Sequence, residues 1–204
     1  MKIICIGGAM GSGKDTFANM LKESLEERDC VNALITHYAD LLKYICTTFL
    51  GWNGEKDEYG RRLLQHVGTE VFRTKDSDYW VKFIAGILQA FPTRWDYVLI
   101  PDTRFPNEII YLEDCGYTVL YLKMFRRVLT NEVAATGQNW AYRSATEHIS
   151  EHALDNMFPD ARIENTGTIE DLRKKAQILA DFLLRPEENI NWCKEYYEKI
   201  NHFG

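Results

Sequence analysis

A chain of 204 residues, 46% of them hydrophobic and 26% charged, is long enough for one globular domain with a core and a small insertion. Its formal net charge of -6 argues against a surface that coats nucleic acid. The five cysteines form no CxxC pair, and no stretch approaches the ~18 apolar residues needed to span a bilayer. We therefore expect a cytoplasmic protein with reduced thiols that binds neither membranes nor nucleic acid.

Runs of apolar residues alternate along the chain with segments of helical periodicity, a pattern typical of an α/β fold with a parallel sheet and crossover helices. Strands are expected at residues 2–6, 31–38, 97–100, 117–123 and 162–164. Helices are expected at residues 14–28, 39–50, 59–72, 77–91, 107–115 and 169–184, with a further amphipathic helix at 187–197. The polar, irregular segment 131–158 is interpreted as a mobile lid region.

A glycine-rich segment follows the first predicted strand and leads into the first predicted helix. It matches a phosphate-binding loop, which requires glycine, four free positions, Gly-Lys and a hydroxyl residue, except that Asp15 displaces the hydroxyl to Thr16. Backbone N–H groups and the helix dipole would hold an anion there, with Lys14 as a mobile cation and Thr16 near Mg²⁺. The alternative is an ordinary glycine-rich turn. The candidate ATP-binding residues of this loop are Gly8, Gly11, Ser12, Gly13, Lys14, Asp15 and Thr16.

The apolar strand at 97–100 runs into Pro-Asp-Thr-Arg, which resembles a Walker B element. The carboxylate of Asp102 would lie at the C-terminal edge of the sheet, where parallel sheets bind ligands, and would hold Mg²⁺ or its waters. Arg104 would clamp a phosphate with two hydrogen bonds. The alternatives are a helix cap for Asp102 and a surface ion pair for Arg104.

The predicted helix at 59–72 carries polar residues that suit a second substrate. It opens with Arg61 and Arg62, and helical spacing puts Arg62, Gln65 and Thr69 close to one face. A face that combines arginine and glutamine suits a phosphate and a base edge. It suits a solvated helix equally well, and the sequence alone does not separate the two interpretations.

Further charged residues are expected near the ends of other strands and in the lid region. Asp40 and Lys43 follow the second predicted strand, where they would touch a second substrate, or where Asp40 would cap the helix. Arg126, Arg127 and Arg143 flank or occupy the predicted lid. A positioned arginine neutralises charge on a phosphoryl group in transfer, although spacing does not decide which of the three does so.

The ordered set of motifs resembles the bacteriophage-type deoxynucleoside monophosphate kinases over residues 2–184. The motifs are GSGKDT at 11–16, YADLLK at 38–43, RRLLQHVGTEVFR at 61–73, DYWVK at 78–82 and VLIPDTRFPNE at 98–108, with a fitting pattern at 146–168. The resemblance implies a P-loop nucleoside-monophosphate-kinase fold, a parallel sheet flanked by helices. Residues 1–185 would form the kinase domain, with a monophosphate-binding region at about 39–91, a lid at about 126–158 and a C-terminal helical extension at 186–204.

The resemblance implies that ATP, with Mg²⁺ as cofactor, gives its γ-phosphate to a deoxynucleoside monophosphate. Lys14 and Thr16 would serve ATP and Mg²⁺, and Asn165 would approach the adenine. Tyr79 and Trp80 would offer an aromatic surface to the acceptor's nucleobase. Relatives suggest a homodimer, and a phage-encoded enzyme would work in the host cytoplasm. Besides Asp40, Lys43, Arg61 and Trp80, the residues expected to line the monophosphate site are Arg62, Gln65, Arg73 and Arg104.

The expected chemistry needs no general base, because the acceptor phosphate has a second pKa of about 6 and is largely ionised near neutral pH. Catalysis would rest on alignment and on charge neutralisation by Lys14, Mg²⁺, Arg104 and one of the lid arginines, with Asp15 orienting one of these groups. Three alternatives remain: a kinase similar to the animal phosphomevalonate kinases, a regulatory P-loop ATPase that transfers nothing, and a kinase of nucleic-acid ends.

Overall fold

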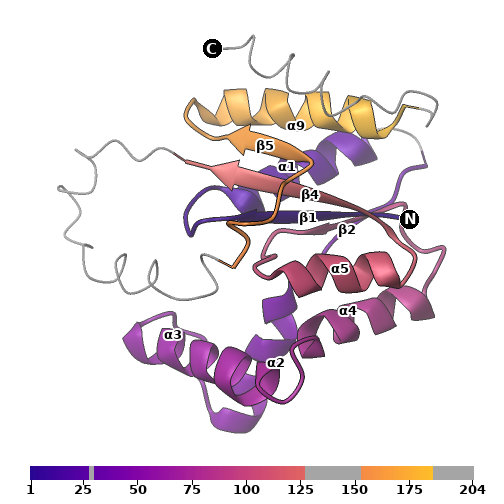
Figure 1. Ribbon diagram of the computed structural model, residues 1–204. Coiled ribbons are helices and arrows are strands. Elements are labelled where there is room, and N and C mark those ends of the chain that lie inside the picture. The colour runs from indigo at the N-terminus through magenta and orange to yellow at the C-terminus, as the bar shows by residue number, and fades with distance from the viewer. Residues whose placement is uncertain (28–29, 127–152, 186–204) are drawn as a thin grey trace.

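Five parallel strands form the centre of the protein in a computed structural model that describes residues 1–27, 30–126 and 153–185 (Figure 1). The strands lie in the spatial order β2-β3-β1-β4-β5, and every neighbouring pair is parallel. The α/β class and the parallel sheet predicted from the sequence are therefore confirmed. The strands are β1 (Lys2–Gly8), β2 (Ala33–Ile35), β3 (Tyr97–Ile100), β4 (Thr118–Phe125) and β5 (Ala161–Glu164).

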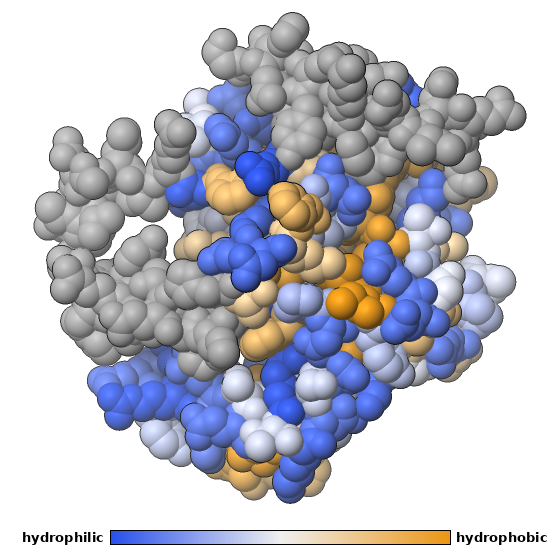
Figure 2. All heavy atoms as spheres, in the orientation of Figure 1, coloured by the Kyte–Doolittle hydropathy of each residue, from blue (hydrophilic) through white to orange (hydrophobic). Residues whose placement is uncertain are grey.

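Helices cover both faces of this sheet, as Figure 1 shows. Helix α1 (Lys14–Glu26) and helix α9 (Ile169–Leu183) pack together on one face. Helix α4 (Tyr79–Ala90) and helix α5 (Pro106–Asp114) cover the other face, and α2 (Tyr38–Leu50) packs against α4. Helix α3 (Glu58–Gln65) packs against α2 at the lower left of Figure 1. Figure 2 shows mainly hydrophilic side chains there.

Alternation along the central strand explains why the sheet is buried on both sides. Ile4 and Ile6 of β1 pack in the core under α1 and α9, whereas Ile3 and Cys5 pack in the core under α4 and α5. Successive side chains of a strand point to opposite faces, so a strand covered on both sides reads as a continuous apolar run. The run at residues 3–6 is of this kind, and the strand was predictable for that reason.

One predicted helix has a different form in the structure. The segment expected as a single α-helix at 59–72 is α3 followed directly by a π-helix, η1 (His66–Arg73). The hydrogen bonds of a π-helix join residues five positions apart instead of four, so side-chain positions after Gln65 no longer follow α-helical spacing. Gly68 lies at a close contact within it, because an added Cβ would lie 2.9 Å from a methyl carbon of Leu42.

Two predicted regions lie largely outside the described residues. These are the central part of the lid region, at 127–152, and the C-terminal extension at 186–204. The end of the predicted lid is described, and Leu154 there is 6% exposed and packs in the core beside Tyr121. Within the described ranges, no helix combines the length and apolar character that a membrane span requires.

Candidate functional site

The glycine-rich loop connects β1 to α1 at the C-terminal edge of the sheet. Gly8 pairs with Met124 of the neighbouring strand, and its φ is 139°. A Cβ on Gly8 would lie 2.3 Å from the Met124 carbonyl oxygen, so only glycine fits. Gly13 has a φ of 95°, and a Cβ there would lie 2.5 Å from Nδ2 of Asn165. Close packing against backbone therefore requires glycine at Gly8, and the positive φ favours glycine at both positions.

The lysine of this loop contacts the loop itself. Lys14 Nζ donates hydrogen bonds to the carbonyl oxygens of Gly8, at 2.6 Å, and Ala9, at 2.8 Å. Helix α1 begins at Lys14, and no side chain caps its first turn. The first turn of a helix has N–H groups without intrahelical acceptors, and together with the helix dipole they form an anion site. A cation and a helix N-terminus thus meet at one place, as a phosphate-binding loop requires.

Two side chains from other strand ends contact this loop. Asn165, which follows β5, donates from Nδ2 to the Ser12 carbonyl oxygen at 3.0 Å. Arg126, which follows β4, lies with Nη1 3.5 Å from the Gly11 carbonyl oxygen. The structure therefore places Asn165 beside the loop. Its contact with adenine stays a prediction, as do the roles of Arg127 and Arg143, which lie outside the described residues.

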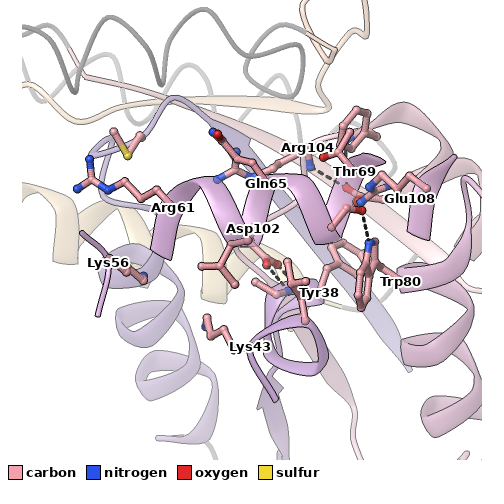
Figure 3. A pocket seen from close by; sticks show the side chains of 17 residues that line it. Tyr38, Lys43, Lys56, Arg61, Gln65, Thr69, Trp80, Asp102, Arg104 and Glu108 are labelled. Atoms are coloured by element: carbon pink, nitrogen blue, oxygen red, sulfur yellow. Dashed lines mark hydrogen bonds and ion pairs between the residues drawn. The ribbon is translucent and has the colours of Figure 1, made fainter. Parts of the chain in front are cut away.

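A cavity of about 300 Å³ opens beside the loop (Figure 3). Met10 brings the glycine-rich loop into its wall, and helices α2 to α5 and the end of β3 supply the rest. Seven of the residues predicted for substrate or metal line this cavity. They are Lys43, Arg61, Gln65, Arg73, Trp80, Asp102 and Arg104.

Arg62 is a wrong prediction for this cavity. Its side chain is 77% exposed and forms an ion pair with Glu58 one turn earlier, whereas Arg61 lines the wall. Arg61, Leu64 and Gln65 of α3 line the cavity, whereas Arg62 lies on another side of this helix. Two adjacent arginines look alike in sequence, but a helix turns them about 100° apart.

Asp40 also lies outside the residues that line the cavity. It is not a lining residue of the pocket. It does not cap α2 either, because it lies in the first turn of that helix and His37 is the N-cap residue. Its Oδ1 accepts a hydrogen bond from Lys43 Nζ at 3.0 Å, and its Oδ2 lies 3.3 Å from His37 Nδ1. Asp40 therefore contacts a residue of the pocket wall and is not itself part of it.

Asp102 caps a helix that is remote from it in sequence. Its Oδ1 accepts the backbone N–H of Tyr38 at 3.0 Å, and its Oδ2 accepts that of Ala39 at 2.9 Å. Burial raises the pKa of Asp102, and the N–H groups of Ala39 and Tyr38 and the charge of His37 oppose that rise. The carboxylate lies at the pocket wall and at the C-terminal end of β3, where the sequence predicted it.

Glu108 is a pocket residue to which the sequence analysis gave no role. It is 1% exposed, forms an ion pair with Arg73, and accepts the backbone N–H of Arg104 at 2.7 Å. The guanidinium of Arg73 also lies 4.2 Å from the ring centre of Phe105. Arg73 thus lines the cavity while its charge is paired at the cavity wall. The Pro-Asn-Glu sequence predicts a helix start with Glu at its third position, which was the available signal for Glu108.

The aromatic surface expected of Tyr79 and Trp80 is only partly present. Trp80 lines the cavity but is 3% exposed, and its indole N–H donates to the Gly68 carbonyl oxygen at 3.0 Å. Tyr79 is not among the lining residues, and its ring packs 4.5 Å from that of Phe72. Trp80 is therefore a packed wall of the pocket and not an exposed platform.

The charges of the cavity are mainly positive. Lys43, Lys56, Arg61 and Arg104 line it besides the paired Arg73, against two carboxylates. Lys56 was not predicted, because it lies in a segment that reads as a polar loop. Among the residues that the structure describes, no cluster of three or more histidine, cysteine or acidic side chains could hold a metal ion. The cavity is thus suited to an anion and lacks an all-protein metal centre in the described part of the chain.

The sheet, the glycine-rich loop and the basic cavity beside it define a P-loop protein with the fold of a small-molecule kinase. In fold it is similar to the APS kinase CysC of Mycobacterium tuberculosis, solved in complex with AMPPNP and APS. The TM-score is 0.50 at 15% identity, over 90% of this chain and 98% of that one. The family model of deoxynucleotide monophosphate kinase matches residues 37–176, about two thirds of the chain. The chain therefore belongs to the deoxynucleotide monophosphate kinase family, which confirms the resemblance found in the sequence.

A curated relative agrees with this assignment. The deoxynucleotide monophosphate kinase of Enterobacteria phage T4 is 32% identical over 126 residues, which cover 60% of this chain and 46% of that protein. The chain thus spans just under half of the length of the curated relative that it matches. The activity of this chain is therefore a separate question.

Proposed function

We propose that this protein transfers the γ-phosphate of ATP to a deoxynucleoside monophosphate, giving ADP and the diphosphate. The observation that carries the proposal is the shared wall between the two sites. Met10 belongs to the glycine-rich loop and also lines the basic cavity. A donor held at the loop and an acceptor held in the cavity would therefore lie side by side, and direct transfer requires that proximity.

The cavity offers unpaired polar groups to an acceptor. Among the described residues, the side chains of Lys56, Arg61 and Gln65 form no ion pair or hydrogen bond with the protein. Figure 3 shows Lys56 and Arg61 on the same side of the view, and both line the cavity. Two cations and an amide at one opening suit an anionic phosphate attached to a group with hydrogen-bonding edges.

In the proposed reaction, the protein aligns the phosphates and neutralises their charge. The attacking oxygen belongs to a phosphate with a second pKa of about 6, so it is ionised near neutral pH and needs no general base. Lys14 would leave its contacts with Gly8 and Ala9 to bind the donor phosphates, and Arg104 would bind the group in transfer. Both roles rely on cations at the point where the two sites meet.

Mg²⁺ belongs to the proposal as a cofactor that accompanies ATP. The available donors fit it, because Mg²⁺ prefers oxygen ligands and is usually held by one or two protein groups together with substrate phosphates. Thr16 offers a hydroxyl in the first turn of α1, and Asp102 offers a carboxylate at the end of β3. When bound, the ion would neutralise charge on the donor phosphates. The proposal also includes a cytoplasmic location, no nucleic-acid partner and a homodimer.

A coupled assay of ADP formation tests the proposal. The acceptors are each deoxynucleoside and ribonucleoside monophosphate, phosphomevalonate, a 5′-hydroxyl oligonucleotide, and a sample without acceptor. We expect ADP formation to depend on a deoxynucleoside monophosphate. Turnover without acceptor that equals turnover with every monophosphate would overturn the kinase assignment. Turnover that occurs only with phosphomevalonate would show that phosphomevalonate, and not a nucleotide, is the acceptor.

Lys14→Ala is the matched inactive variant for this assay. It should lower turnover by at least about 10²-fold, the usual cost of removing one preorganised donor from a transition state. Circular dichroism should show an unchanged fold, because the hydrogen bonds that Lys14 donates to Gly8, Ala9 and Ser12 lie within the glycine-rich loop. Full activity of Lys14→Ala would remove Lys14 from the mechanism.

A further inference from the structure

His37 lies between two carboxylates that belong to different helices. Its Nε2 is 2.8 Å from Oδ1 of Asp15, in the first turn of α1. Its Nδ1 is 3.3 Å from Oδ2 of Asp40, in the first turn of α2. The imidazole therefore bridges the helix that follows the glycine-rich loop and the helix that borders the basic cavity.

The bridge continues into the cavity wall. Oδ1 of Asp40 accepts a hydrogen bond from Lys43 Nζ at 3.0 Å, and Lys43 lines the cavity. Burial would raise the pKa of Asp40, but Lys43 and His37 outweigh it and lower that pKa. Asp40 is thus held by both side chains, with one oxygen near His37 and the other near Lys43. One chain of contacts runs from Asp15 through His37 and Asp40 to Lys43.

The ring of His37 is available for this bridge because another residue caps its helix. His37 is the N-cap residue of α2, yet its side chain makes no capping hydrogen bond. Asp102 accepts the backbone N–H groups of Tyr38 and Ala39 instead. The imidazole is about one quarter exposed, and it faces carboxylates at both nitrogens. A neutral imidazole has one N–H and an imidazolium has two, so the ring donates to both carboxylates in its charged form.

We propose that His37 is a positioning residue that couples the donor loop to the acceptor pocket. Through Asp15 the imidazole is anchored to the first turn of α1, and through Asp40 it sets the place of the Lys43 ammonium for the phosphate of the acceptor. The inference rests on the proposed function, because it assigns Lys43 to an anionic acceptor. His37 would touch neither substrate, and it lies just outside the YADLLK motif at 38–43.

Three variants and a double variant test the coupling. His37→Gln keeps a donor for one carboxylate only, and His37→Arg keeps a cation that donates in several directions. Lys43→Met removes the ammonium that the bridge is proposed to hold, and His37→Gln is also made in that background. For each protein, kcat and the KM values of ATP and of the deoxynucleoside monophosphate are measured, together with calorimetric binding of the monophosphate alone.

The proposal predicts a selective effect on the acceptor. His37→Gln should raise the KM and the Kd of the monophosphate about tenfold, the size expected for one lost charged hydrogen bond, with the KM of ATP changed less than about twofold. His37→Arg should stay within about threefold of the original protein. In the Lys43→Met background, His37→Gln should change the monophosphate Kd less than about twofold, because residues that act through one contact are not additive.

Other outcomes overturn the coupling. A His37→Gln protein with unchanged acceptor KM, or with equal losses for ATP and acceptor, contradicts a role through Lys43. So does a full additional tenfold loss of binding in the Lys43→Met background. Calorimetry separates this failure from failure of the proposed function. If the protein binds monophosphates but transfers no phosphate, the proposed function is wrong. The role of His37 is then still tested through the Kd of the monophosphate.

Discussion

The carboxylate of Asp102 and the backbone N–H of Tyr38 are 64 positions apart in the chain and 3.0 Å apart in space. The end of strand β3 thereby caps helix α2, which supplies Tyr38, Ala39, Leu42 and Lys43 to the pocket. An aspartate at this strand end thus holds a helix that lines the cavity, and in the proposed function it also faces the metal that accompanies ATP. The two alternatives considered for Asp102 are compatible, because each oxygen has a second lone pair.

The cap predicts a measurable loss of stability when it is removed. Asp102→Ala should lower the free energy of unfolding by about 1–2 kcal/mol, the usual cost of losing a helix cap. Asp102→Asn keeps one acceptor oxygen, so its free energy of unfolding should lie between those of the original protein and Asp102→Ala. Urea denaturation followed by circular dichroism measures both values. An Asp102→Ala protein as stable as the original would show that the capping hydrogen bonds contribute nothing.

Two glycines of the donor loop should respond differently to alanine. Gly8→Ala should prevent folding or destabilise the protein by more than about 2 kcal/mol, because its Cβ would lie 2.3 Å from the Met124 carbonyl oxygen. Gly11→Ala is the matched control, since it also has a positive φ, 78°, but no atom within 4 Å of its Cβ. It should cost only about 1 kcal/mol of backbone strain. Thermal unfolding compares them, and equal losses would contradict the role of the β1–β4 contact.

The adjacent arginines of α3 offer a similar matched pair. Arg61→Ala should raise the KM of the acceptor about tenfold or more, because Arg61 lines the cavity and charged hydrogen bonds to a phosphate are among the strong ones. Arg62→Ala should leave it within about twofold, since an exposed ion pair with Glu58 contributes little. The reverse order in steady-state kinetics would mean that the acceptor binds on another face of the helix.

The same pair shows how far the sequence was informative. The glycine-rich loop was predictable residue by residue, because phosphate binding demands fixed residue types at fixed spacing over Gly8–Lys14. The strands were predictable from apolar runs such as residues 3–6. Arg61 and Arg62 were not separable, because both fit a helix, and the choice depends on how α3 packs against α2. The change to a π-helix at His66 has no simple sequence signal.

Contacts between distant residues account for the rest of what the sequence did not provide. Glu108 and Arg73 are 35 positions apart, and only the tertiary structure brings them together. The cap from Asp102 to α2 and the bridge from His37 to Asp15 are likewise made between separate elements. In the sequence, each of these residues is equally consistent with an ordinary residue at a helix start or in a loop. Local spacing cannot rule out that simpler interpretation.

The buried pair of Glu108 and Arg73 predicts a pH dependence of stability. Burial raises the pKa of Glu108 above its usual 4.5, and the charge of Arg73 and the backbone N–H groups of Arg104 and Phe105 oppose the rise without cancelling it. The folded protein therefore binds this proton more tightly than the unfolded chain. The contribution of Glu108 to stability is complete below about pH 4.5 and is lost as the pH rises through the higher folded pKa.

Glu108→Gln isolates this contribution, because glutamine has the shape of the protonated acid and does not titrate. The free energy of unfolding of the original protein minus that of Glu108→Gln should fall as the pH rises from about 4.5. Chemical denaturation at a series of pH values measures the difference, and acids elsewhere cancel because both proteins share them. Arg73→Met should extend the fall to higher pH, since it removes the cation that favours the ionised form. A difference that rises with pH would show that the ion pair with Arg73 outweighs burial.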